Sequence, residues 1–173
     1  TRYGYIARNK SNSNKRIWYS GENFRTPYGQ ADGYLGFDNS DSEENVIYFP
    51  HWMFRLYSEF YNGKKNEIDY LEYLSSPRIP ISRNTKACIF SSSLDPRRVL
   101  ISRVLEEFTE VERFGRAFDN VIENKQHTSS GFGLQICPEN SIYPGYVTEK
   151  LIESWECGNV PIWEGLDSQN FFN

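Results

Sequence analysis

The chain has 173 residues, of which 38% are hydrophobic and 16% aromatic, so it is long enough to bury a substantial core. Its formal net charge of −4 argues against non-specific binding to nucleic acid. No apolar run reaches the roughly 20 residues that a transmembrane helix requires, and residues 1–15 lack the apolar middle of a signal peptide.

The first half of the chain consists of short apolar runs separated by polar turns. The runs that we predict as strands are residues 17–19, 34–37 and 46–49. An acidic turn, residues 38–44, joins the last two and is expected to be solvated. Residues 51–61 are predicted to form a helix, and the proline-rich residues 75–86 are the best candidate for a linker.

After this linker, the predicted order of elements is strand, helix, strand, strand, helix, strand. The strands lie within residues 86–93, 109–114, 133–137 and 160–163. One helix begins with an Asp95 cap and Pro96 and runs to about residue 108, with an apolar stripe. The stripe consists of Leu100, Val104, Leu105 and Phe108. A second helix follows Thr148 and stops at Gly158, so the order of elements favours a parallel α/β sheet.

The few cysteines and histidines limit the metal and disulfide chemistry of the chain. Cys88, Cys137 and Cys157 are widely spaced within apolar runs, and we interpret them as buried free thiols, which favours a reducing compartment. The only histidines are His51 and His127, so a histidine-rich metal site is not expected. We interpret His51 as a surface or helix-capping residue.

Polar residues gather where the predicted strands end and the predicted helices begin. Residues 137–141 follow a strand and residues 146–150 open a helix, and ligands of parallel sheets bind at this edge. Lys150 and Arg98 could bind an anion there, and Glu149 could accept hydrogen bonds from a diol such as a ribose. The same three side chains are also compatible with an ordinary solvated surface.

Several short motifs occur in a defined order along nearly the whole chain. They are Gly21-Glu22-Asn23, Gly36-Phe37-Asp38, Arg55-Leu56, the segment from Ser91 to Arg98, Glu139-Asn140-Ser141, and the segment from Gly145 to Lys150. A proline-containing strand, VPIWEG, follows them. In this order the motifs resemble the family 10 glycosyltransferases, the α-1,3/α-1,4-fucosyltransferases, and the bacterial branch most closely.

The resemblance implies an α/β fold of the GT-B type, with two Rossmann-like domains facing a cleft. Full members of the family have further elements at both ends, so we expect each domain to be partial. Residues 1–84 are assigned to the C-terminal part of the acceptor-binding domain with the linker. Residues 85–173 are assigned to the N-terminal part of the nucleotide-sugar (donor) binding domain.

The resemblance also implies roles for individual residues. Glu22 corresponds to the catalytic base, and Tyr19 would line the acceptor side. The donor-binding residues would be Arg98 and Lys150 on the diphosphate, Glu149 on the ribose, and Tyr146 and Asn140 near the sugar nucleotide.

The expected activity is the inverting transfer of L-fucose from GDP-fucose to a glycan. The acceptor hydroxyl would belong to a saccharide containing N-acetylglucosamine or glucose, and the linkage would be α-1,3 or α-1,4. GDP-fucose is the donor substrate, and neither a metal nor another cofactor is obligatory. Two alternatives stay open: a GT-B transferase with a different nucleotide-sugar donor, and a truncated relative that only binds.

The expected partners are a nucleotide sugar and an oligosaccharide or glycolipid acceptor, such as a Lewis-type antigen on lipopolysaccharide, and not nucleic acid. The expected location is the cytoplasm, with peripheral association at the inner membrane through segments absent from the chain. The alternative, for a eukaryotic source, is the lumenal side of the Golgi membrane.

Overall fold

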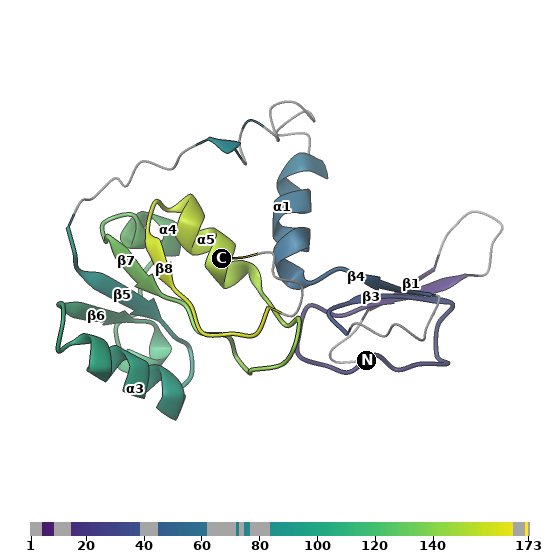
Figure 1. Ribbon diagram of the computed structural model, residues 1–173, viewed down its shortest axis with the longest axis horizontal. Helices are drawn as coiled ribbons and strands as arrows, with labels where there is room; N and C mark the ends of the chain where they lie inside the picture. The colour runs from purple at the N-terminus through teal and green to yellow at the C-terminus, as the bar shows by residue number, and fades with distance from the viewer. Residues whose placement is uncertain are drawn as a thin grey trace. The chain divides into compact units, whose positions relative to one another are not determined.

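A computed structural model describes residues 5–8, 15–38, 45–61, 72, 75–76, 84–167 and 172 (Figure 1). The chain forms two compact units. Unit 1 comprises Thr1–Leu71, Glu139–Glu149 and Gly165–Asn173, and unit 2 comprises Glu72–Pro138 and Lys150–Glu164. The predicted division at residues 84 and 85 follows chain order alone, and it stays a prediction.

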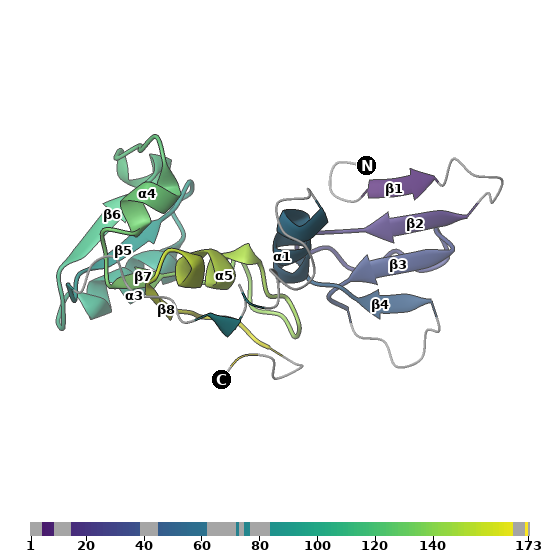
Figure 2. The same ribbon diagram turned by 90° about the horizontal axis from the view of Figure 1, so that it is seen from above.

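Unit 1 is built on a four-stranded sheet with the order β1-β2-β3-β4 (Figure 2). Its strands are β1 (Tyr5–Arg8), β2 (Arg16–Tyr19), β3 (Gly33–Gly36) and β4 (Val46–Tyr48). β1 runs antiparallel to β2, whereas β2, β3 and β4 are parallel. Helix α1 (His51–Tyr61) follows β4. The three predicted strands and the helix are confirmed to within one residue, but β1 was not predicted.

Aromatic side chains form the core of unit 1. Trp18 of β2 and Tyr34 of β3 are buried and lie against one another, with ring centroids 6.3 Å apart. Phe37, just after β3, meets the edge of the buried Tyr146 ring at a centroid distance of 5.0 Å. This contact joins residues 139–149 to a sheet that lies far away in the sequence.

Unit 2 contains a four-stranded sheet that is parallel throughout, as predicted. Its order is β6-β5-β7-β8. The strands are β5 (Ala87–Phe90), β6 (Val111–Phe114), β7 (Leu134–Ile136) and β8 (Val160–Ile162). The helical segments are α3 (Pro96–Leu105), the 3₁₀ helix η1 (Arg116–Phe118), α4 (Lys125–Ser129) and α5 (Glu149–Glu156). The first residue of α5 belongs to unit 1.

The sheet of unit 2 has a core on each face, because alternate side chains of a strand point to opposite sides. On one face, Ala87 and Ile89 of β5 pack with Ile101 and Leu105 of α3. On the other face, Cys88 packs in a cluster with Phe114 and Phe132. α3 covers the first face, and α4 and α5 lie on the other side (Figure 1).

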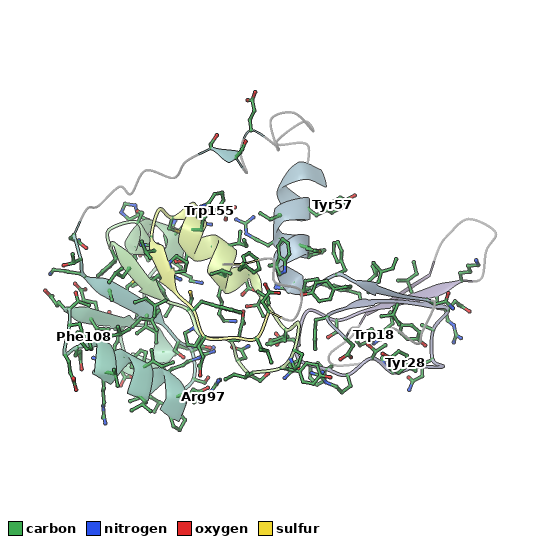
Figure 3. The ribbon with its side chains drawn as sticks, viewed as in Figure 1. Trp18, Tyr28, Tyr57, Arg97, Phe108 and Trp155 are labelled. Atoms are coloured by element: carbon green, nitrogen blue, oxygen red, sulfur yellow. The ribbon has the colours of Figure 1, made fainter. Side chains whose placement is uncertain are left out.

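The beginning of α3 agrees with the sequence, but of its predicted apolar stripe only Leu105 packs against the core. Asp95 caps the helix by accepting a 2.9 Å hydrogen bond from the Arg97 N–H. Of the stripe, Leu100, Val104 and Phe108 are exposed, at 62%, 47% and 79%, and Phe108 lies beyond the end of the helix (Figure 3). The face turned towards the sheet instead carries two buried polar residues, Arg98 and Ser102, beside Ile101 and Leu105.

The remaining predictions for unit 2 concern its last helix and the cysteines. Gly158 ends α5 with a left-handed φ of 80°, and its N–H donates to the Trp155 carbonyl. All three cysteines are free, and Cys88 and Cys137 are buried, whereas Cys157 is half-buried. Within the described part of the chain, no helix has the length and apolarity needed to cross a membrane.

Candidate active site

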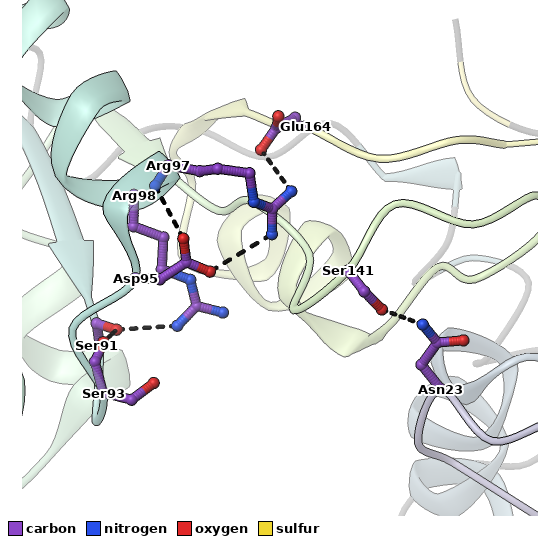
Figure 4. Close-up of polar contacts among 8 residues, drawn as sticks. All are labelled: Asn23, Ser91, Ser93, Asp95, Arg97, Arg98, Ser141 and Glu164. Atoms are coloured by element: carbon purple, nitrogen blue, oxygen red, sulfur yellow. Dashed lines mark hydrogen bonds and ion pairs between the residues drawn. The ribbon is translucent and has the colours of Figure 1, made fainter.

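Arg98 lies at the carboxyl end of β5, where the sequence placed it. The residue is only 7% exposed, and its Nη1 donates a 2.9 Å hydrogen bond to the Ser91 hydroxyl (Figure 4). Ser91 directly follows β5, and its own hydroxyl donates to the Ser93 carbonyl at 2.7 Å. The strand-end turn therefore orients the guanidinium, which is suited to bidentate binding of phosphate oxygens.

Arg97, the neighbour of Arg98, is used differently. Its guanidinium is 3.5 Å from Asp95 and 3.3 Å from Glu164, and the side chain is about one-third exposed (Figure 4). These contacts form a surface ion-pair network within unit 2. Arg98 is therefore the better candidate for an anion ligand, and Arg97 offers a matched comparison.

Glu22 lies in the loop after β2, and its side chain is exposed. Two hydrogen bonds hold its backbone in place. The Glu22 N–H donates to the buried Ser20 hydroxyl at 3.2 Å, and that hydroxyl donates to the Glu22 carbonyl at 3.0 Å. The turn fixes the main chain but leaves the carboxylate accessible to a substrate. An accessible carboxylate on a fixed turn is compatible with a general base.

Side-chain contacts tie this loop to two other motifs within unit 1. The Asn23 side-chain amide donates to the Ser141 hydroxyl (Figure 4), and Arg25 donates to the side-chain oxygen Oδ1 of Asn23. Arg25 also forms a 2.8 Å ion pair with Asp38 and lies over the Tyr143 ring. The motifs at 21–23, 36–38 and 139–141 thus form one connected group.

Asp38 corrects one expectation from the sequence. Instead of belonging to a solvated turn, its carboxylate accepts hydrogen bonds from the Thr26 N–H at 2.7 Å and the Thr26 hydroxyl at 2.9 Å. Its side chain is 11% exposed. Residues 39–44 of the predicted turn lie outside the described residues.

Tyr146 is buried among carboxylates of unit 1. Burial raises the pKa of its hydroxyl, and the negative charges of Glu22, Glu139 and Glu149 raise the pKa further. Tyr19 behaves similarly, because burial, and then the charge of Glu149, raises its pKa to about 12. Both phenols are therefore hydrogen-bond donors at neutral pH.

The structure divides the predicted site residues between the two units. Those of unit 1 are Tyr19, Glu22, Asn140, Tyr146 and Glu149, and those of unit 2 are Arg98 and Lys150. Asn140 is exposed, and Lys150, the second residue of α5, is half-buried. The charges of Glu22 and Glu149 both act on the Tyr146 hydroxyl, although Glu22 lies far from Tyr146 and Glu149 in the sequence.

Sequence reasoning missed several residues that shape this region. Glu149 Oε2 lies 2.5 Å from His51 Nδ1, although His51 was interpreted as a surface or capping residue. Arg25, Tyr143 and the buried Glu139 were also not assigned. In the sequence, the signal for Glu139 was its position directly before Asn140, with Ser141 on the other side. The described residues contain no cluster of three or more acidic, histidine or cysteine side chains that could hold a metal ion.

A protein-family model matches residues 81–172 of the chain. The matching model describes the C-terminal part of glycosyltransferase family 10 (fucosyltransferase). Among curated proteins, the chain is 25% identical over 181 residues to the alpha-(1,3)-fucosyltransferase FucT of Helicobacter pylori, covering 89% of this chain and 38% of the relative. It is 30% identical over 96 residues to the 4-galactosyl-N-acetylglucosaminide 3-alpha-L-fucosyltransferase 9 of Mus musculus, covering 53% of this chain and 27% of the relative.

Two solved structures of an alpha1,3-fucosyltransferase are similar to the chain. One, a complex with GDP-fucose, has a TM-score of 0.70 at 24% identity and is matched over 91% of this chain and 54% of its own. The other has a TM-score of 0.71 at 22% identity, over 89% and 53%. The likeness confirms the predicted GT-B-like α/β fold class. The chain spans only 38% and 27% of the length of the two curated relatives above.

Proposed function

Since the chain belongs to glycosyltransferase family 10, we propose that the protein is an inverting fucosyltransferase that uses GDP-fucose as its donor. The acceptor is a hydroxyl of a glycan containing N-acetylglucosamine or glucose, and the linkage formed is α-1,3 or α-1,4. The observation that carries the proposal is the hydrogen bond from Asn23 to Ser141, which joins the loop of Glu22 to the segment of Tyr146 and Glu149 within unit 1. These residues come from the motifs on which the family resemblance rests.

Glu22 acts as the general base of the transfer. The donor carries its nucleotide in the β configuration and the product is α-linked, so a single displacement with inversion is required. Glu22 takes the proton from the acceptor hydroxyl as its oxygen bonds to the anomeric carbon, and the bond from that carbon to the phosphate oxygen breaks. The bonding electrons leave with GDP. This role is supported by the exposed carboxylate of Glu22 and by the hydrogen bond from its N–H to Ser20, which fixes the turn.

Arg98 and Lys150 bind the diphosphate and stabilise the negative charge that develops on the leaving GDP. The burial of Arg98 and its contact with Ser91 support this assignment, because a preorganised cation loses little freedom on binding. Glu149 accepts hydrogen bonds from the ribose hydroxyls. Tyr146 and Asn140 lie near the sugar nucleotide.

Tyr19 lines the acceptor side, since it lies three residues before Glu22. Its hydroxyl is buried and has no hydrogen-bond partner among the described residues, so it can receive a polar group of a ligand. We propose a saccharide acceptor like that in the name of the mouse relative, an N-acetylglucosaminide, on an oligosaccharide or glycolipid. A Lewis-type antigen on lipopolysaccharide would be the product of transfer to such an acceptor.

A donor panel tests the activity. GDP-fucose, GDP-mannose and UDP-galactose are each incubated with the intact protein and an N-acetyllactosamine acceptor. The proposal expects transfer from GDP-fucose alone, giving an α-linked product by mass spectrometry and NMR. Preferred transfer from another nucleotide sugar would replace the donor assignment. Binding of GDP-fucose without transfer would indicate a relative that only binds.

We also propose a cytoplasmic location, with peripheral association at a membrane. The three free thiols support a reducing compartment, where unpaired cysteines persist. Fractionation of cells expressing the tagged intact protein tests this, and recovery from an oxidising lumen would contradict it.

A further inference from the structure

His51 and Glu149 form a short hydrogen bond within unit 1. The Nδ1 atom of His51 lies 2.5 Å from Oε2 of Glu149, and the side chains are 32% and 26% exposed. Because an ionised carboxylate only accepts hydrogen bonds, the imidazole donates from Nδ1. His51 is the first residue of α1 and Glu149 the first of α5, so the contact joins the starts of two helices.

Neighbouring residues hold the imidazole in this position. Its ring is stacked on Phe54, at an interplanar angle of 13°, and Phe54 is in turn stacked on Tyr19. On the loop that carries Glu22, a Cβ added at Gly21 would lie 2.7 Å from the Cδ2 atom of His51. The absence of a side chain at Gly21 therefore allows the ring to approach the backbone of that loop.

We propose that His51 is a positioning residue for Glu149, and this inference rests on the proposed function, in which Glu149 binds the ribose diol of GDP. A glutamate side chain at the start of a helix can adopt several rotamers. A ligand that binds only one of these rotamers loses affinity, because the side chain must be ordered on binding. The hydrogen bond from the stacked imidazole selects one orientation before the donor arrives. A carboxylate has about four acceptor positions, and the bond to His51 uses one of them.

The role of His51 is tested by binding of GDP and of 2′,3′-dideoxy-GDP, which lacks the ribose diol. Calorimetric dissociation constants are measured for the intact wild-type protein and for His51→Phe, His51→Asn and His127→Ala. His51→Phe keeps an aromatic ring on Phe54 but removes the donor. His51→Asn restores a donor close to the position of Nδ1, and His127 is an exposed histidine of α4 that serves as the control.

We expect His51→Phe to weaken GDP binding by about tenfold, in line with the loss of a hydrogen bond to a charged group, and to change dideoxy-GDP binding by less than about twofold. His51→Asn should recover most of the affinity for GDP, and His127→Ala should behave as the wild type does. A purely structural role for His51 would affect both ligands equally, and this result would overturn the inference. Equal binding of GDP and dideoxy-GDP by the wild type would also overturn it.

These outcomes are distinguishable from a failure of the proposed function. If the donor panel shows no fucose transfer but the effect of His51 still depends on the ribose diol, the activity is wrong and the positioning role stands. If transfer occurs and the two ligands respond equally to His51→Phe, the positioning role is wrong and the activity stands.

Discussion

Thr148 donates two hydrogen bonds to the carboxylate of Glu139, one from its N–H at 2.8 Å and one from its hydroxyl at 2.7 Å. Glu139 is fully buried, so these bonds replace water for its oxygens. Glu139 directly precedes Asn140, and Thr148 directly precedes α5. The pair therefore fixes both ends of the segment that carries Asn140 and Tyr146, and Glu149 directly follows this segment.

Glu139→Gln should destabilise the protein. The amide keeps the size of the side chain but removes its negative charge, and the Thr148 hydroxyl must then accept from the amide NH₂ group instead of donating to a carboxylate oxygen. The expected loss is about 2 kcal/mol in the free energy of unfolding, measured by urea denaturation. Glu107→Gln, at an exposed position after α3, is the control and should change this free energy by less than about 0.5 kcal/mol. A loss as small as the control's would show that the buried pair contributes little.

Arg98→Ala should weaken the binding of GDP by about tenfold or more, because it removes a buried guanidinium assigned to the diphosphate. Arg97→Ala is the matched control, since Arg97 is the adjacent arginine but is paired with Asp95 and Glu164. Its effect on the dissociation constant should stay within about twofold. Titration calorimetry with GDP measures both, and equal effects of the two substitutions would remove Arg98 from the donor site.

Tyr19 should make stability depend on pH in the alkaline range. Burial, and then the charge of Glu149, raises its pKa to about 12, whereas an unfolded tyrosine ionises near about 10. Between these values the unfolded chain releases a proton that the folded chain keeps. The contribution of Tyr19 is therefore complete below the unfolded pKa and decreases as the pH rises towards the folded one.

The check on Tyr19 is the melting temperature measured between about pH 9 and 12. Tyr19→Phe should make its decline with pH shallower than in the wild type. Tyr28→Phe, at an exposed position, should leave the slope unchanged. An identical slope for wild type and Tyr19→Phe would mean that the Tyr19 hydroxyl titrates as it does in the unfolded chain.

Gly21→Ala should reduce fucose transfer without unfolding the protein. The added Cβ would lie 2.7 Å from the His51 ring, which must then move away from its stacked position. Gly33→Ala is the control, because the nearest atom to its Cβ would be 3.8 Å away. We expect the Gly21 variant to lose about tenfold in kcat/KM and the control to stay within about twofold, as assayed with GDP-fucose. Full activity of Gly21→Ala would show that the approach of His51 is not needed.

Local sequence patterns were sufficient for most strands but not for the buried face of α3. Runs such as RIWY and ACIF contain β-branched and aromatic residues, and both form strands. In α3 the buried positions are spaced as in any helix, but Arg98 and Ser102 occupy two of them. The polar Ser102 can be buried, because its hydroxyl donates to the Val99 carbonyl and accepts from Arg113. For this reason the polarity of Ser102 did not predict its exposure.

The candidate site was predictable only in part, for a similar reason. The motifs identified Glu22, Glu149 and Arg98, because their types and positions carry the resemblance. His51 and Arg25 act through partners far away in the sequence, and no local pattern predicts those pairings. β1 was not predicted, because its stability comes from antiparallel pairing with β2, which no local pattern shows.

The most direct measurement of the central claim is the transfer rate of Glu22→Gln together with its affinity for GDP. The amide has nearly the shape of the carboxylate but cannot accept the proton of the acceptor hydroxyl. We predict a loss of transfer of at least about a hundredfold with an unchanged GDP dissociation constant. Transfer at the wild-type rate would contradict the assignment of Glu22 as the base and, with it, the proposed mechanism.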